Sequence, residues 1–251
     1  RSSGPCASKW SLRQLRDHLE SRGLDYELMM SQIKDLIIKT IIAVEPPIVN
    51  MWHSGANYCG TGSQGGSRGL GPSHNCFEIY GFDVLVDEGL KPWLLEVNTA
   101  PSLSSSSPFD KRVKTQLIAE TLTLVGIRPF DYRLVEQAVL EERRCQREGL
   151  GSKPKTLQKS HTVQSVSTCS VSDFGEAEWA TIVDAHDEHM RRGSLERIFP
   201  TQETGSLYGD MFSVPRYSNL VLAKWFKEGG EDLFRGRAPS MVPRLLHEEA
   251  C

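Results

Sequence analysis

The stretch Asn75–Leu103, NCFEIYGFDVLVDEGLKPWLLEVNTAPSL, decides the fold of the chain around it. It contains two apolar, strand-like runs, Phe77–Val86 and Trp93–Val97, which are joined by a tight connection at Asp87–Gly89. Two runs of this length around a turn predict an antiparallel β-hairpin.

Three side chains with oxygen ligands interrupt the apolar runs: Asp83 in the first, Glu96 in the second and Asn98 just after it. Side chains alternate between the faces of a strand, so Glu96 and Asn98 point the same way, and Asp83 lies opposite or diagonal to Glu96. Such oxygens suit a hard cation such as Mg²⁺. Charged strand-edge residues are also common on protein surfaces. The pattern alone therefore leaves a metal or active site and an ordinary solvated edge both open.

Composition excludes several classes of protein. Of the 251 residues 39% are apolar, and the formal net charge of -3 argues against a nucleic-acid-binding polycation. The six cysteines are scattered without a C-x-x-C pair, which argues against a zinc site and a disulfide scaffold and favours a reducing compartment. No apolar run predicts a membrane span or a signal peptide. Because residue 1 is Arg and not Met, we expect a fragment or a sequence that lacks its start.

Helices are predicted on both sides of the hairpin. The first begins after Ser8 or Ser11 and ends at Gly23, and the second covers Tyr26–Val44 and stops at Pro46–Pro47. The remaining expectations are a Gly-rich insertion at 51–72 within a subdomain at 8–130, a helix at Phe109–Val125, a charged helix at 131–148, a flexible linker at 149–172, a helical and aromatic segment at 173–228, and a tail at 229–251.

Lys111, Arg112 and Lys114 form a basic cluster after the Ser-rich loop that follows Asn98. Such a cluster is often plain surface. It also lies where it could attract an acidic substrate toward a metal at the hairpin, so both interpretations remain.

The run CFEIYGFDVLVDEGLKPWLLEVNTAPSLSSSSPFDKRVKTQLIAETLTLVG resembles the C-terminal part of the tubulin tyrosine ligase-like family, most of all its polyglutamylase branch. Four shorter segments are similar to the same family in the expected order, and together the matches cover roughly half to two-thirds of the chain. These segments are Lys9–Leu12, Asp35–Thr40, Gly193–Pro200 and Pro215–Trp225.

The resemblance implies the C-terminal portion of an α/β ATP-grasp fold, with antiparallel strands packed against helices and a helical extension. It implies an ATP-dependent ligase that adds glutamate to glutamate side chains of tubulin tails through an acyl phosphate. Asp83, Glu96 and Asn98 would be the cofactor-binding ligands of two Mg²⁺ ions, with Glu96 bridging them and Glu96 and Asn98 as the catalytic pair. Metal ions held by such oxygen ligands neutralise the charge of the phosphates during phosphoryl transfer.

The resemblance also implies partners and departures. Tubulin, its α or β tails, microtubules and glutamate are the expected partners, without nucleic acid or membrane, for a monomer in the cytoplasm on the cytoskeleton, with cilium or basal body as a further option. Thr99 stands where chain-lengthening members often carry a basic residue, which favours branch initiation. A glycine donor stays open.

The nucleotide-gripping half of the family fold is expected upstream of Arg1. We therefore expect that the 251 residues alone neither bind ATP tightly nor turn over. A non-catalytic relative that binds tubulin or microtubules, and a ligase of the same fold with another substrate, remain as alternatives.

Overall fold

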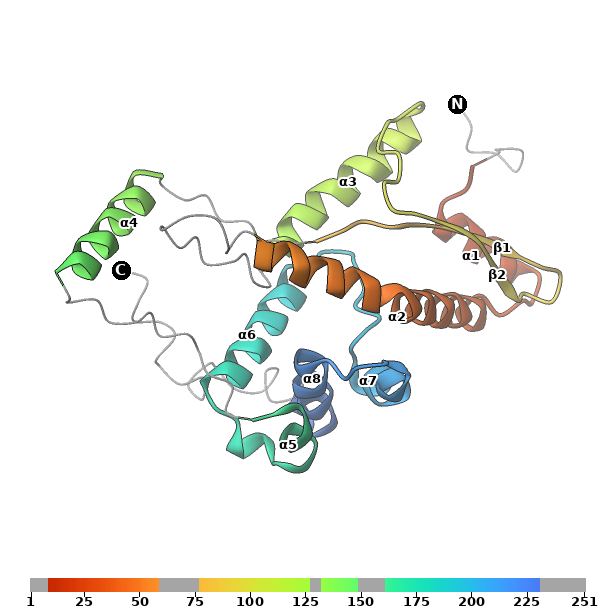
Figure 1. The fold of residues 1–251 in the computed structure, drawn as a ribbon. Coiled ribbons are helices and arrows are strands. Elements are labelled where there is room, and N and C mark those ends of the chain that lie inside the picture. The colour runs from red at the N-terminus through yellow and green to blue at the C-terminus, as the bar shows by residue number, and fades with distance from the viewer. Residues whose placement is uncertain (1–8, 59–76, 127–131, 149–160, 231–251) are drawn as a thin grey trace. The chain divides into compact units, whose positions relative to one another are not determined.

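The computed structural model describes residues 9–58, 77–126, 132–148 and 161–230, which fall into two compact units (Figure 1). The first unit contains the chain up to Tyr58 and the segment Glu78–Ser102, and the second contains the residues from Leu103 onward. The predicted mixture of helices with an antiparallel sheet is confirmed. The predicted subdomain at 8–130 differs from this division, because the hairpin and the helix that follows it belong to different units.

The first unit is a helical pair packed against a two-stranded sheet. Its elements are α1 (Leu12–Ser21), α2 (Tyr26–Tyr58), β1 (Gly81–Val86) and β2 (Pro92–Asn98). Helix α1 starts at Ser11, whose hydroxyl accepts the Gln14 N–H at 3.2 Å while the Gln14 side chain accepts the Ser11 N–H at 2.9 Å. This reciprocal pair selects Ser11 over Ser8 as the cap.

Buried side chains of both helices form the core of the first unit. Leu19 of α1 and Tyr26 and Met29 of α2 are less than one-tenth exposed, and Val86 and Leu90 of the hairpin pack against them. The face of the hairpin that carries Val86 is therefore the covered face, and the opposite face is left to solvent within this unit.

Helix α2 does not stop at the proline pair. It continues through Pro46 and Pro47 to Tyr58, so the predicted end at Val44 was wrong, and the first residues of the predicted insertion at 51–72 are helical. Each proline removes one N–H from the helical ladder, but neighbouring prolines remove consecutive bonds that a bend in one place can accommodate. The remainder of that insertion, 59–72, lies outside the described residues.

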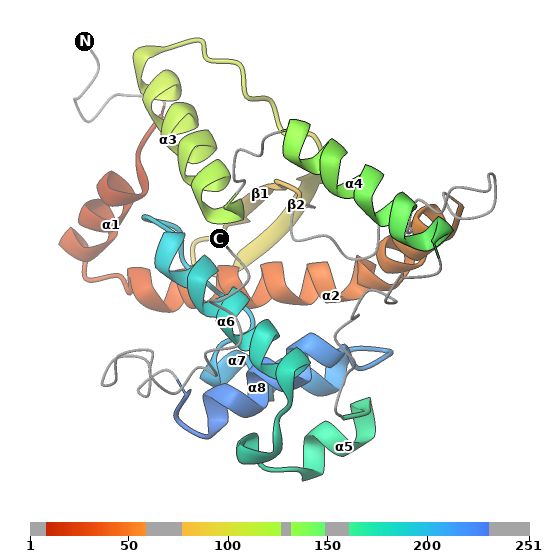
Figure 2. The same cartoon turned by 90° about the vertical axis from the view of Figure 1, so that its left-hand side faces the viewer.

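Helices make up the second unit (Figures 1 and 2). They are α3 (Pro108–Val125), α4 (Tyr132–Arg147), α5 (Val163–Thr168), η1 (Val171–Asp173), α6 (Glu176–Arg191), α7 (Gln202–Tyr208), η2 (Gly209–Met211) and α8 (Tyr217–Lys227). Helix α8 contacts α5, α6 and α7. Their shared core is Val166, Val171, Phe174, Ile182, Val221, Leu222, Trp225 and Phe226.

Part of the predicted flexible linker at 149–172 is folded. Residues 161–172 contribute α5 and η1, and Val166 is fully buried, so the linker interpretation was wrong for this half, while 149–160 lie outside the described residues. The hydroxyls that suggested a solvated segment act as helix caps: Thr162 accepts the Ser165 N–H at 3.2 Å.

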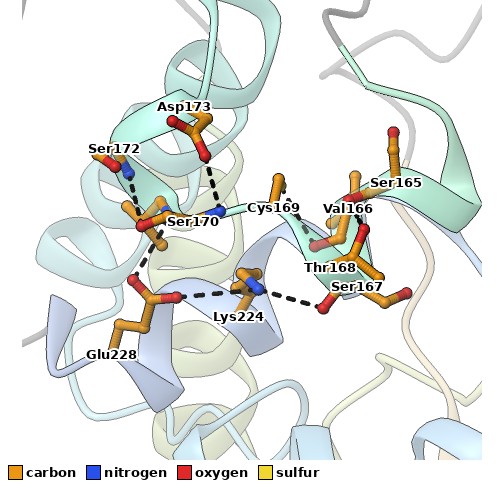
Figure 3. Close-up of polar contacts among 11 residues, drawn as sticks. Ser165, Val166, Ser167, Thr168, Cys169, Ser170, Ser172, Asp173, Lys224 and Glu228 are labelled. Atoms are coloured by element: carbon orange, nitrogen blue, oxygen red, sulfur yellow. Dashed lines mark hydrogen bonds and ion pairs between the residues drawn. The ribbon is translucent and has the colours of Figure 1, made fainter.

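Helix α8 holds this segment with two charged side chains (Figure 3). Lys224 donates from Nζ to the Ser167 carbonyl at 3.2 Å, and Glu228 accepts the Val171 N–H at 3.4 Å. The same two side chains lie 3.9 Å apart as an ion pair. The charges thus satisfy the C-terminal end of α5 and the N-terminal end of η1, where backbone groups lack helical partners.

Glu178 is a buried carboxylate in the second unit. It is fully buried and accepts the Gly175 N–H at 3.0 Å, the His161 N–H at 3.2 Å and the hydroxyl of Tyr217. Burial raises the pKa of Glu178, but the hydrogen bonds, led by that of Tyr217, outweigh it and the pKa is lowered. Glu178 therefore fixes the start of α6 to α8 through Tyr217.

Candidate active site

The hairpin brings the three predicted oxygen ligands together. β1 and β2 pair antiparallel, with Asp83 directly opposite Glu96 and Gly81 directly opposite Asn98. The Nδ2 of Asn98 donates to Oε1 of Glu96 at 3.1 Å. All three side chains are exposed within the described residues. β1 begins at Gly81 and not at Phe77 as predicted, and β2, Pro92–Asn98, extends one residue beyond the predicted run at each end.

A β-bulge decides which way Glu96 points. The pairing runs from Val84 with Leu94 directly to Asp83 with Glu96, so Leu95 is an extra residue without a partner on β1. Before the bulge Leu94 shares the covered face with Val84, and after it Glu96 shares the open face with Asp83. The adjacent pair Leu94–Leu95, in a strand whose side chains should alternate, is one weak sign of this irregularity.

The arrangement fits a hard cation. Two carboxylates directly across an antiparallel pair repel each other, and a cation between them would remove that repulsion. Within the part of the chain that the structure describes, no hydrogen bond or ion pair reaches Asp83, and the contact from Asn98 is the one made to Glu96. Two carboxylates and one amide oxygen are the donors that Mg²⁺ prefers.

Gly81 lies opposite Asn98 in the sheet and close to Pro101. A Cβ at Gly81 would lie 3.1 Å from the Pro101 Cβ and 3.6 Å from the Asn98 Cβ. A side chain there would crowd Pro101, whereas its contact with Asn98 would be an ordinary van der Waals contact, so glycine lets Pro101 lie close to the start of β1. Sequence reasoning did not single out Gly81, and its place opposite Asn98 becomes visible only once the register is known.

The turn of the hairpin is locked by Asp87. Its Oδ1 accepts the Gly89 and Lys91 N–H groups at 2.9 and 3.0 Å, and its Oδ2 accepts the indole N–H of Trp93 at 2.9 Å. The Lys91 ammonium lies 3.9 Å from the centre of the Trp93 ring. The Trp93 hydrogen bond, followed by those of the backbone, lowers the pKa of Asp87. This lock fixes the separation of the strands that carry Asp83 and Glu96.

Acid is expected to loosen the turn. The pKa of Asp87 is lower in the folded chain than the value of about 3.9 for a free aspartate. The stabilisation by its charge is therefore complete above that value and is lost as the pH falls through the lower folded pKa. The indole N–H signal of Trp93 in NMR spectra should shift in this acid range. Asp87→Asn should remove the titration, and an unchanged titration in that variant would contradict the lock.

The predicted basic residues lie on α3 in the second unit. The Lys114 ammonium donates to the Ser104 carbonyl, the Arg112 guanidinium lies 5.8 Å from the centre of the Phe109 ring, and Lys111 is exposed. Thr99 is exposed in the bend after Asn98 in the first unit. The three basic side chains thus differ in their surroundings, although the sequence grouped them.

Two further searches of the described residues were negative. No three His, Cys, Asp or Glu side chains among them gather in a way that could hold a metal. Within the same ranges, every helix is too short or too polar to cross a membrane.

Comparison with known proteins identifies the family. The model of the tubulin-tyrosine ligase family matches residues 2–133, about half of the chain, and the chain belongs to this family. Human tubulin monoglutamylase TTLL4 is 31% identical over 238 residues, which cover 86% of this chain and 18% of the relative. Mouse tubulin polyglutamylase TTLL5 is 33% identical over 252 residues, which cover 92% of this chain and 18% of the relative.

A nematode relative covers a larger share. Tubulin polyglutamylase ttll-4 of Caenorhabditis elegans is 30% identical over 225 residues, which are 86% of this chain and 35% of the relative. The chain thus spans less than a fifth of the human and mouse relatives and about a third of the nematode one.

Proposed function

We propose that this chain supplies the metal-binding strands of an ATP- and Mg²⁺-dependent ligase of the ATP-grasp type. The ligase joins glutamate to glutamate side chains in the C-terminal tails of tubulin. The observation that carries the proposal is the direct pairing of Asp83 with Glu96, with Asn98 bound to Glu96 on the same open face.

Each residue has a distinct role in this proposal. Asp83, Glu96 and Asn98 would hold two Mg²⁺ ions, with Glu96 as the ligand common to both and Asp83 and Asn98 as further ligands. Asn98 contributes an oxygen without adding negative charge next to the phosphates. Bound Mg-ATP would supply the γ-phosphoryl group that activates the acceptor carboxylate, with release of ADP, and attack by the amine of the incoming glutamate would form the amide bond and release inorganic phosphate. Asp87 and Trp93 hold the strands at a fixed spacing.

The substrate follows from the relatives. Those at about 30% identity are named as tubulin monoglutamylases and polyglutamylases. We therefore propose tubulin as the protein substrate, glutamate as the donor, and the microtubule cytoskeleton of the cytoplasm, including that of cilia, as the place of action. Thr99 next to Asn98 favours starting a branch, and Lys111, Arg112 and Lys114 are the proposed substrate-side cations.

A chimera tests the ligase proposal. In mouse tubulin polyglutamylase TTLL5, the segment that aligns with this chain is replaced by the chain itself. We expect ATP-dependent incorporation of radiolabelled glutamate into tubulin by the chimera, and at least a hundredfold lower rate with Asp83→Asn. The exposed turn residue Glu88, changed to Gln, is the matched control and should leave the rate unchanged.

The competing outcome is a non-catalytic tubulin-binding protein. The ligase proposal would be overturned in favour of that alternative by a chimera that transfers no glutamate, although it shows a cooperative thermal unfolding transition and binds an ATP analogue. Transfer of glycine in place of glutamate would overturn the donor.

A further inference from the structure

A small hollow lies along α3, entirely within the second unit. It has a volume of about 370 Å³, and its lining includes Leu103, Ser105, Lys111, Lys114, Thr115 and Ile118. Lys111 and Lys114 are three residues apart, so their side chains leave the same side of the helix. Two lysine side chains therefore line this surface depression, and none of the hairpin residues Asp83, Glu96 and Asn98 is part of its lining.

The two lysines of the hollow have different tasks. Lys114 ties the Ser-rich loop to α3 through the Ser104 carbonyl. The ammonium of Lys111 makes no hydrogen bond or ion pair with any residue that the structure describes. Arg112 does not line the hollow and is placed over Phe109. Lys111 is thus the cation that is available to a ligand there.

The remaining lining selects the class of anion. Ser105 and Thr115 offer hydroxyl groups, while Leu103 and Ile118 offer apolar surface beside the ammonium groups. A glutamate side chain matches both parts, because its carboxylate can reach the lysines while its two methylenes cover the apolar surface. Aspartate has one methylene fewer and covers less of it.

We propose that this hollow binds a glutamate side chain of an acidic peptide. The inference rests on the proposed function in one respect, since a tubulin tail being glutamylated is the acidic peptide that would present such side chains. It adds Leu103 and Ile118 to the proposed substrate-side cation Lys111 as the recognition surface of the hollow, which Arg112 does not line.

The test measures peptide binding by the complete 251-residue chain, without ATP or Mg²⁺. The probe is a fluorescent hexaglutamate peptide, followed by anisotropy at low salt, with hexa-aspartate and hexaglutamine peptides for comparison. We expect the order glutamate, aspartate, glutamine from tightest to weakest. Lys111→Gln, which breaks no described contact, should weaken hexaglutamate binding about fivefold.

The matched control is Lys227→Gln, an exposed lysine on α8 outside the hollow, which should change the affinity little. Equal losses of hexaglutamate affinity in Lys111→Gln and Lys227→Gln would overturn the inference, because the attraction would then depend on the net charge of the chain and not on the hollow. Equal binding of hexa-aspartate and hexaglutamate would also overturn it, since the apolar surface would have no role.

The two proposals fail separately. If Lys111→Gln loses hexaglutamate binding and the chimera is inactive, the peptide-binding proposal stands and the ligase proposal is overturned. Unchanged binding in Lys111→Gln together with an active chimera would retain the ligase and overturn the hollow.

Discussion

Replacing Glu96 with glutamine is expected to abolish divalent-cation binding at the hairpin. Glu96 stands opposite Asp83 in the register of the sheet and accepts a hydrogen bond from Asn98. Glutamine keeps the shape and removes the charge, so two carboxylates become one. With a single carboxylate the hairpin no longer has the charge that offsets the loss of water from Mg²⁺.

Mn²⁺ gives a direct measurement of this effect. In the 251-residue chain, Mn²⁺ should broaden the amide NMR signals of Asp83, Glu96 and Asn98 first. Glu96→Gln should remove the selective broadening, whereas Glu88→Gln in the exposed turn should keep it. In the chimera with mouse TTLL5, Glu96→Gln should lower glutamate transfer at least a hundredfold. Selective broadening that survives in Glu96→Gln would exclude Glu96 as a ligand.

Replacing Trp225 with alanine should cause the largest loss of stability in the second unit. Trp225 is 5% exposed, belongs to the core formed by α5, η1, α6 and α8, and meets Trp179 edge to face at 5.4 Å. Truncation of such a side chain removes its buried area, leaves a cavity and loses the aromatic contact, at a cost of about 3–5 kcal/mol.

Amide hydrogen exchange measures this cost unit by unit, which matters because a chain with two units does not unfold in one step. Ile182 of α6 and Val221 of α8 are buried reporters of the affected core. Their protection should fall by the stated free energy in Trp225→Ala. Leu207→Ala, at a side chain that is 67% exposed, is the control and should stay within about 0.5 kcal/mol of the parent. Unchanged protection of Ile182 would show that Trp225 is not part of its core.

Local rules predicted much of the fold. Two apolar runs around a turn predicted the hairpin, and Ser11, one of the two caps expected for the first helix, acts as its cap in the structure. The rules failed where tertiary contacts outweigh local preference. Pro46 and Pro47 lie inside α2, and the Ser- and Thr-rich segment at 161–172 is folded because Val166 and Val171 enter the core of the second unit.

The sequence predicted the three oxygen-bearing residues of the candidate site but not the neighbouring residues that position them. Asp83, Glu96 and Asn98 are recognisable because polar residues interrupt apolar strands. Asp87 accepts a hydrogen bond from Trp93, and a Cβ at Gly81 would come close to Pro101, and both relations depend on the turn and on the register. Neither contact has a signature in the sequence, since Asp and Gly are ordinary residues at a turn and at a strand start.

The unpaired residue Leu95 has a consequence for comparing this chain with its relatives. Because Leu95 has no partner on β1, a relative that lacks this residue would still place its glutamate opposite its aspartate. A deletion between Pro92 and Leu94 would instead change which residues of β2 stand opposite the turn-side residues of β1. Asp83 and Glu96 would then remain opposite each other only if the turn became longer. Insertions and deletions in this strand are therefore not equivalent. An alignment that places its gap at Leu95 is the one that preserves the pairing of Asp83 with Glu96.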